Sequence, residues 1–204
     1  MHFRRLSLLA LMTCLASSAT PLQAGDITPF GAFRTGGEFT DTATGDTLDI
    51  ENTGAYGIIL GMPYQKNTEF EIFYSHQRTS LVEQSSTGAN KLFDLNIDYI
   101  QFGGTSMFKT TPAVQPFVSG GLGFSWFSPG LDGLDSELRP AVGIGVGVRL
   151  KLGERIGLRF ELRGTGTFFG SGSSIFCSNG QCAANLRGEL LFQTDALIGA
   201  SFTF

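Results

Sequence analysis

The sequence predicts an all-β protein, an eight-stranded antiparallel up-and-down transmembrane β-barrel. Three observations support this fold class. Apolar and polar side chains alternate with a period of two along several segments, which is the period of a β-strand. These segments are about ten residues long, which suits a tilted strand that crosses a bilayer. The connections between them are alternately short and long, as in barrels with turns at one end and loops at the other.

The first three expected strands are residues 28–39, 56–62 and 69–77. The first alternates weakly and the second is short. The third is more regular, because apolar side chains such as Phe70 alternate with polar ones such as Glu71. These segments predict strands at the start of the barrel, with the third defined best.

The fourth expected strand, residues 93–108, changes register partway along. Leu95, Ile97 and Tyr99 occupy one face, whereas Ile100 and Phe102 occupy the other. A β-bulge would reconcile the two registers, although the pattern does not give its position.

The last four expected strands are the most regular: residues 118–126, 138–151, 156–168 and 190–204. In the middle two, apolar side chains share one face, and charged residues and glycines share the other. A helix would spread these charges around its circumference, so a strand explains them better. The last segment is apolar at every second position except Thr194, and it ends on Phe204.

The connections fall into two groups. Residues 63–68, 109–114 and 151–155 are expected to be short turns, and residues 40–54, 79–93, 128–137 and 169–187 longer, polar loops. Eight antiparallel strands place both termini at the end of the barrel that carries the short turns.

Residues 1–24 have the features of a secretory signal peptide. Two arginines precede the apolar run 6–16, and a small-residue cleavage site ends at Ala24. The apolar run is too short to span a membrane as a helix. We therefore expect a signal peptide over 1–24 and one barrel domain over 25–204.

Composition excludes several classes of function. The formal net charge is −4, and removal of residues 1–24 takes away two arginines and no acid, which leaves −6. A nucleic-acid partner is not expected, because it would need a basic face. Two of the three cysteines, Cys177 and Cys182, lie in the last long loop. In an oxidising compartment this pair predicts a small local disulfide, and the neighbouring residues supply too few ligands for a metal.

Alternation alone does not say which face points outward, because a lipocalin-like barrel has the same period with its apolar face inside. Aromatic residues gather near the strand ends, like the interfacial girdles of membrane barrels. The polar face carries charges of both signs and many glycines, which suits a narrow packed lumen. These features favour the membrane barrel.

Charged residues on the polar registers are expected in the lumen, because they would be costly against lipid. The candidates are Arg34, Glu38, Glu71, Asp98, Arg149, Arg159, Glu161, Arg163, Glu189 and Asp195. They are expected to form a network of mixed sign, since unpaired buried charges are unfavourable. Such a network would fill and rigidify the lumen; the alternative is a narrow path for ions or small solutes.

The signal peptide, the eight alternating strands and the terminal Phe204 resemble the small eight-stranded bacterial outer-membrane β-barrel superfamily, which includes outer membrane proteins A, X and W and the opacity proteins. The resemblance implies a Gram-negative outer membrane and periplasmic termini. It also implies that Phe204 is an assembly signal. The partners that it implies are outer-membrane lipid, lipopolysaccharide, periplasmic chaperones and the barrel-assembly machinery. A monomer is expected.

The expected function is non-enzymatic, with a structural or surface-interaction role in the cell envelope and without a cofactor or metal. The alternative is a narrow, porin-like channel, and a distant alternative is a lipid-modifying enzyme that uses His76. Ser75 precedes this histidine, but adjacent residues of a strand point to opposite faces. The glycines of residues 143–147 lie inside an alternating strand, so crowding in a narrow barrel or sharp local bending explains them better than a nucleotide-binding loop.

Overall fold

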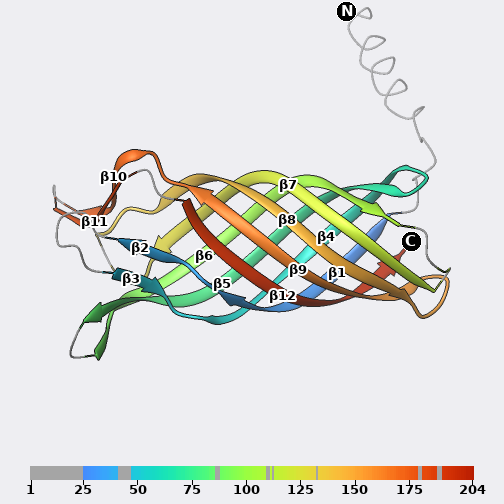
Figure 1. The fold of residues 1–204 in the computed structure, drawn as a ribbon, viewed down its shortest axis with the longest axis horizontal. Coiled ribbons are helices and arrows are strands. Elements are labelled where there is room, and N and C mark those ends of the chain that lie inside the picture. The colour runs from blue at the N-terminus through green and yellow to red at the C-terminus, as the bar shows by residue number, and fades with distance from the viewer. Residues whose placement is uncertain are drawn as a thin grey trace, which may run out of the picture.

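Eight antiparallel strands close into a barrel in the computed structural model of the chain (Figure 1). The described residues are 25–40, 47–85, 88–108, 111, 113–131, 133–178, 181–187 and 190–204. The barrel strands are β1 (Asp26–Thr35), β4 (Thr53–Gln65), β5 (Thr68–Ser85), β6 (Gly88–Met107), β7 (Val114–Pro129), β8 (Glu137–Lys151), β9 (Ile156–Phe168) and β12 (Leu190–Thr203). The predicted fold class is confirmed, while the expected signal peptide lies outside the described residues.

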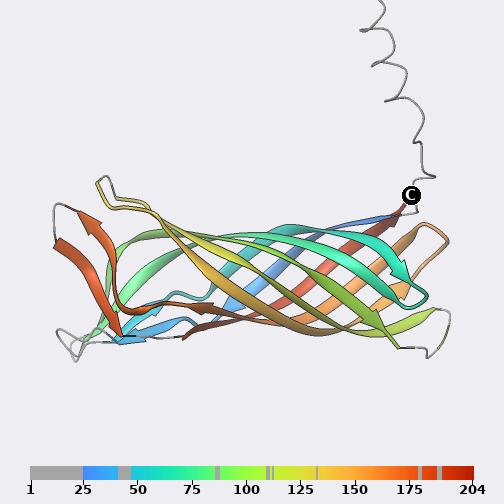
Figure 2. The ribbon, with the colours of Figure 1, turned by 90° about the horizontal axis from the view of Figure 1, so that it is seen from above.

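The ring closes between the two ends of the described chain. β1 pairs with β4 on one side and with β12 on the other, and β5 pairs with β6 to complete the circle. Figure 2 shows the same barrel from a second side, with its strands running obliquely along its length. Because each of the eight barrel strands pairs with two others, the backbone groups of the wall are paired within the sheet. Among the described residues, no helix is long and apolar enough to cross a membrane.

The two ends of the barrel differ. The short connections lie at one end, the short-turn end, where the Phe204 N–H donates to the Gly25 carbonyl oxygen at 3.0 Å. The other end, the long-loop end, carries β2 (Glu38–Thr40), β3 (Thr47–Ile50), β10 (Ser171–Ser178) and β11 (Gln181–Arg187) (Figure 1).

Three of the segments expected as loops contain regular structure. β3 lies within residues 40–54 and pairs with β5, and the β10–β11 hairpin lies within 169–187. Residues 79–93 continue β5 and β6 almost to their turn. β5 and β6 are therefore longer than the expected strands 69–77 and 93–108. Polar residues that face outward can still belong to a paired strand.

The apolar side chains of the barrel face outward and many polar ones face inward. Leu122 and Ile144 are each 70% exposed, whereas Arg34 and Arg159 are fully buried. A lipocalin would show the opposite distribution. The wall therefore has the polarity of a barrel that is surrounded by lipid.

The polarity of both faces reverses along β6, without a bulge at that point. The β5–β6 register runs unbroken from Thr68↔Ser106 to Leu81↔Phe93. Tyr99 and the two alternate residues before it, Ile97 and Leu95, point into the lumen, while Ile100 and Phe102 point outward. The apolar residues thus change faces along β6 because the lumen becomes apolar and the outer face becomes polar, and not because the strand pairing shifts. The irregularity of this pair lies further along, between Leu81 and Val82.

Apolar residues fill the part of the lumen toward the long-loop end. The buried cluster consists of Phe30, Leu48, Ile50, Ile59, Phe73, Leu81, Phe93, Leu95, Ile97, Tyr99, Phe127, Phe169, Leu191 and Leu197. It joins the barrel wall to β3, since Leu48 and Ile50 belong to that strand. The long-loop end therefore has an apolar interior, like a water-soluble β-protein.

Candidate functional site

Two arginines and two glutamates form a buried square across the lumen. Glu161 lies between Arg159 and Arg163 on β9, and Glu71 reaches both arginines from β5 on the far side of the ring. Glu161 accepts from Arg159 Nε at 2.8 Å and from Arg163 Nε at 2.9 Å. Glu71 accepts from Arg159 Nη2 at 2.8 Å and from Arg163 Nη2. All four side chains are at most 5% exposed, and their charges cancel.

Hydroxyl groups complete the hydrogen bonding of the buried square. Thr105 Oγ1 donates to Glu71 Oε2 and Ser119 Oγ donates to Glu161 Oε1, each at 2.6 Å. Burial of charge is unfavourable unless good geometry and further hydrogen bonds compensate for lost water. The square meets both conditions, so it is a neutral, closed network.

Aromatic rings cover the faces of three buried guanidinium groups. The pairs are Arg159 over Phe117 at 4.5 Å, Arg163 over Phe73 at 4.0 Å and Arg34 over Tyr99 at 4.6 Å. A guanidinium over a ring gains cation–π attraction and occupies space that water would otherwise fill. The rings thus pack the lumen around the charges.

A second buried pair joins the strands that close the ring. Arg34 on β1 binds Asp195 on β12 through two hydrogen bonds, of 2.6 and 3.0 Å. Its Nη2 also donates to Ser75 Oγ at 2.7 Å. The neighbouring Tyr99 donates from its hydroxyl to Gln193 Oε1 at 2.6 Å. These contacts tie three parts of the wall together inside the lumen.

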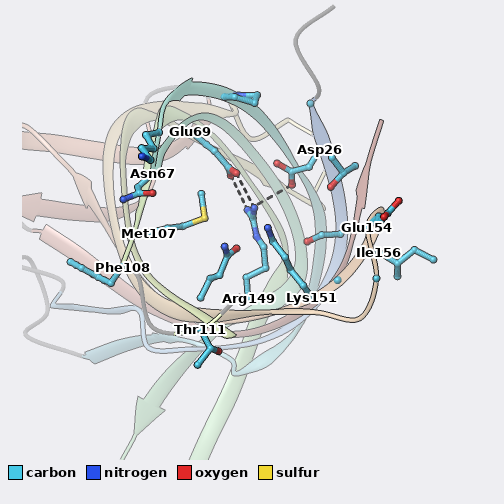
Figure 3. A pocket seen from close by; sticks show the side chains of 18 residues that line it. Asp26, Asn67, Glu69, Met107, Phe108, Thr111, Arg149, Lys151, Glu154 and Ile156 are labelled. Carbon is cyan, nitrogen blue, oxygen red and sulfur yellow. Dashed lines mark hydrogen bonds and ion pairs between the residues drawn. The ribbon is translucent and has the colours of Figure 1, made fainter. Parts of the chain in front are cut away.

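A third pair lies at the inner boundary of a cavity that opens at the short-turn end. Arg149 donates two hydrogen bonds of 2.9 Å to Glu69 and lies 3.8 Å from Asp26 (Figure 3). The cavity has a volume of about 620 Å³, and Lys66 and Lys151 are among its lining residues. It is a vestibule that leads to the Arg149–Glu69 pair.

The apolar cluster closes the opposite half of the lumen. Phe30 and Phe73 stack with ring centroids 5.4 Å apart, and Phe127 and Phe169 lie 5.6 Å apart. Leu191, on β12, is fully buried. Over its described residues the lumen is therefore blocked by two consecutive layers, one charged and one apolar.

Glycines on β8 make room for the buried square. A Cβ atom at Gly145 would overlap Glu161 Oε1 and Ser119 Oγ, and one at Gly143 would overlap Gln101 Oε1. An eight-stranded barrel is just wide enough for its own side chains. These glycines thus leave space for large polar groups, in keeping with the crowding expected in a narrow barrel.

Most of the charges expected in the lumen are buried there. They are Arg34, Glu71, Arg149, Arg159, Glu161, Arg163 and Asp195. Glu38 lies elsewhere and is exposed in β2, because Gly36 and Gly37 adopt positive φ angles (85° and 111°) and interrupt the alternation that starts in β1. Glu189 lies outside the described residues.

Asp98 points outward, not into the lumen. Its carboxylate Oδ1 lies 2.8 Å from His76 Nδ1 and accepts from the Tyr74 hydroxyl at 2.8 Å. The reason is the reversal of polarity along β6, which puts Tyr99 inside and its charged neighbour outside. Ser75 is buried and faces the lumen, so it does not lie beside His76.

Sequence reasoning missed the partners of Arg149. Glu69 shares its register with Glu71, and this signal could have identified it. Asp26 is the second residue after the expected cleavage site and precedes the first expected strand, residues 28–39. Gln101, which accepts from Arg163 at 3.1 Å, lies where the apolar alternation of the fourth expected strand moves from one face to the other.

The two cysteines of the last long loop face each other in the backbone register. Cys177 pairs with Cys182 in the β10–β11 hairpin. Directly opposite residues of an antiparallel pair have Cα atoms about 4.5–5.5 Å apart, within the range that a disulfide needs. Their side chains lie outside the described part, so the disulfide stays a prediction. Among the described residues, no three His, Cys, Asp or Glu side chains are grouped so that they could hold a metal.

An apolar outer wall around a packed lumen that buries charged side chains defines a membrane-spanning β-barrel. The model of the outer membrane protein beta-barrel domain family matches residues 8–204, and the chain belongs to this family. The predicted resemblance to small bacterial outer-membrane barrels is confirmed.

Solved structures show the same fold. Neisserial surface protein A is similar at a TM-score of 0.59 and 15% identity, over 89% of this chain and 99% of that protein. OprG from Pseudomonas aeruginosa has a TM-score of 0.59 at 11% identity, over 89% and 96%. The N-terminal barrel domain of OprF from the same organism has 0.52 at 16%, over 89% and 98%. No curated protein matches the chain.

Proposed function

We propose that this chain is a non-enzymatic outer-membrane barrel with a structural or surface-interaction role in the cell envelope. The observation that carries the proposal is the double closure of the lumen by the buried square and the apolar cluster. A barrel so filled is rigid and offers no continuous water path along its described lumen. What it presents to other molecules is then its outer wall and its long-loop end.

We further propose that the long-loop end faces outward from a Gram-negative cell and that both termini are periplasmic. Gly25 and Phe204 meet at the short-turn end, in keeping with this orientation. The partners in this proposal are lipopolysaccharide and other outer-membrane lipid, with periplasmic chaperones and the barrel-assembly machinery during biogenesis. A monomer is proposed, since the closed ring leaves no strand edge free within the wall.

Conductance in planar bilayers tests the proposed function. The refolded protein, with heat-modifiable migration on a gel as proof of folding, is expected to give no single-channel steps under conditions in which a known porin conducts. Regular steps of uniform size from the folded protein would contradict a structural role and would support a channel.

A narrow channel is the second candidate, and the vestibule at the short-turn end favours it. The vestibule has a volume of about 620 Å³ and extends to Arg149, so ions could enter the barrel to this depth from one end. If the barrel conducts, Arg149→Gln should change its selectivity between anions and cations. The matched substitution Arg155→Gln, at an exposed position of a short turn, should not.

A lipid-modifying activity of His76 is the distant alternative. Asp98 could orient its imidazole, since Nδ1 lies 2.8 Å from the carboxylate. Ser75, the residue next to it, points into the lumen and accepts a hydrogen bond from Arg34. Lipid analysis of cells that express the wild type and His76→Ala is expected to give identical profiles.

A further inference from the structure

The outer wall contains a polar and aromatic group where lipid-facing residues would be expected. Five outward-facing side chains form this interface cluster: Tyr56, Tyr74, His76, Asp98 and Trp126. Four of them are direct cross-strand neighbours, in the order Tyr56↔His76↔Asp98↔Trp126 across β4 to β7. Adjacent side chains of such a series are about 5 Å apart at Cβ. The cluster is thus one continuous patch on four strands.

The charged centre of the interface cluster is held in a fixed orientation. Asp98 Oδ1 contacts both His76 Nδ1 and the Tyr74 hydroxyl at 2.8 Å, and the Tyr56 and His76 rings lie 5.4 Å apart. Flanking aromatic residues stay accessible, since Tyr56 is 58% and Trp126 53% exposed. An ordered carboxylate between two exposed rings is a preformed site rather than a mobile surface charge.

The surroundings of the interface cluster are apolar on one side and polar on the other. Toward the short-turn end, the next outward residues on β6 and β7 are Ile100 and Phe124. Toward the long-loop end, the next series is Arg78↔Asn96↔Ser128, and Arg78 is exposed. Residues 68–76 of β5 cover roughly 20 Å along the barrel axis, which approaches the 25 Å height of an apolar band. The cluster therefore lies at the lipid–water boundary.

We propose that the interface cluster binds the phosphorylated sugar headgroup of an outer-leaflet glycolipid, lipopolysaccharide. The ligand must be amphipathic, because its anchor has to run along the apolar wall below the cluster. Exposed tyrosine and tryptophan rings suit the apolar faces of a sugar, and the Asp98–His76 pair can bind its hydroxyl groups. Arg78 lies on the same outer face of β5, one residue pair nearer the long-loop end, and suits a phosphate on that sugar. This inference rests on the proposed orientation, with the long-loop end outside.

Charge distribution favours a glycolipid over an ordinary phospholipid. A headgroup with a single phosphate would need little more than Arg78, and the carboxylate of Asp98 would repel it at short range. A phosphorylated sugar extends over several ångström and can satisfy the rings, the carboxylate and the guanidinium at once. We therefore assign the cluster to the glycolipid and use the phospholipid as a comparison.

Fluorescence titration tests the assignment, because Trp126 is the single tryptophan of the chain. The full-length mature barrel is folded into phosphatidylcholine vesicles, and lipopolysaccharide is added in steps. A saturable change of Trp126 emission is expected for the wild type. Asp98→Asn should weaken the midpoint about tenfold or more, the loss expected for a charge-assisted hydrogen bond.

Asp94→Asn is the matched control. It is the same substitution on the same strand and the same face, and its carboxylate also has a partner, Lys91 at 2.6 Å. Its titration midpoint should stay within about twofold of the wild type, because Asp94 is exposed, lies two residue pairs from Asp98 along β6 and makes no contact with the ligand in this assignment. Tyr56→Leu serves as a second site variant if Asp98→Asn fails to give a heat-modifiable band.

Three outcomes would overturn the assignment: no saturable change for the wild type, equal midpoints for the site variants and Asp94→Asn, or an equal response to phosphatidylethanolamine. These outcomes leave the proposed non-conducting, closed barrel untouched, because conductance and heat-modifiable migration are measured separately. Conversely, a conducting wild type would contradict the closed lumen without changing the titration.

Discussion

Glu161 is the side chain on which the buried square depends most. Its two oxygens accept from Arg159, Arg163 and Ser119, and the residue is almost fully buried. Replacing the whole network by apolar side chains could be tolerated, because buried ion pairs often add little net stability. Removing one partner is different, because it leaves an uncompensated positive charge inside the lumen.

We expect Glu161→Gln to lower the free energy of unfolding by about 3–5 kcal/mol. The amide keeps the shape of the side chain but leaves the two arginines with one carboxylate between them. Urea titration of the barrel in vesicles, followed by gel mobility, measures this change. Glu154→Gln, at an exposed position of a short turn, should change stability by no more than about 0.5 kcal/mol.

The double variant Glu161→Gln with Arg163→Gln separates charge balance from lost hydrogen bonds. It restores neutrality, so its destabilisation should be clearly smaller than the sum of the two single effects. Strict additivity, or a Glu161→Gln variant as stable as Glu154→Gln, would show that the square is not a coupled network.

β6 shows what an alternating sequence pattern can and cannot predict about a single strand. The apolar positions of this strand were visible, but alternation reports which residues share a face and not what surrounds that face. In the part of β6 toward the short-turn end, Phe102 faces outward. In the part toward the long-loop end, Ile97 faces inward. Both are apolar for different reasons, contact with lipid and contact with the apolar cluster. A single assumption about polarity therefore placed Asp98 on the wrong side.

Cysteine labelling tests this reversal along the strand. Asn96→Cys and Phe102→Cys both place a thiol on the outer face of β6, in a chain whose Cys177 and Cys182 are replaced by serine. A membrane-impermeant maleimide applied to intact cells should label the first variant and leave the second unlabelled. The reason is that the outer face is in water at one position and in lipid at the other.

Detergent-solubilised, denatured samples of both variants provide the control, since both thiols should then react equally. Equal protection of both thiols in cells would place the part of β6 around Asn96 in lipid or at the periplasmic side. Equal labelling of both would exclude a lipid-facing wall at Phe102.

At the scale of the whole molecule, eight strands, their order and the burial of most lumen charges followed from the sequence. Alternation is a property of each strand, and up-and-down order follows from short connections. The arrangement across the ring did not follow, since the meeting of Glu71 with Arg159 depends on the stagger of strands on opposite walls. Glu38 was misplaced because two positive-φ glycines end the alternation before it.

The terminal residue is expected to matter for assembly and not for stability. Phe204 is 65% exposed, and it lies one residue beyond the end of β12. We expect Phe204→Ala to reduce the heat-modifiable fraction in cells several-fold. The refolded variant should unfold within about 1 kcal/mol of the wild type in urea, the scale of an exposed substitution.

Phe33→Ala, at another exposed aromatic position, is the control, because it removes a similar area from the outer wall. It should assemble normally in cells. If both variants lose assembly alike, or if Phe204→Ala is strongly destabilised after refolding, a special role for the terminal residue is contradicted.

The reversal of polarity along β6 also fixes how deep the molecule sits. A shift by one pair of residues along the strands, roughly 5 Å along the membrane normal, would bring Asp98 into hydrocarbon or lift Ile100 to the lipid–water boundary. Because β5, β6 and β7 stay paired with one another beyond the interface cluster, the wall cannot kink there to absorb a change in membrane thickness. The surrounding lipid has to thin or thicken instead, at a modest cost per ångström. The long-loop end is thereby held at a constant height above the lipid headgroups.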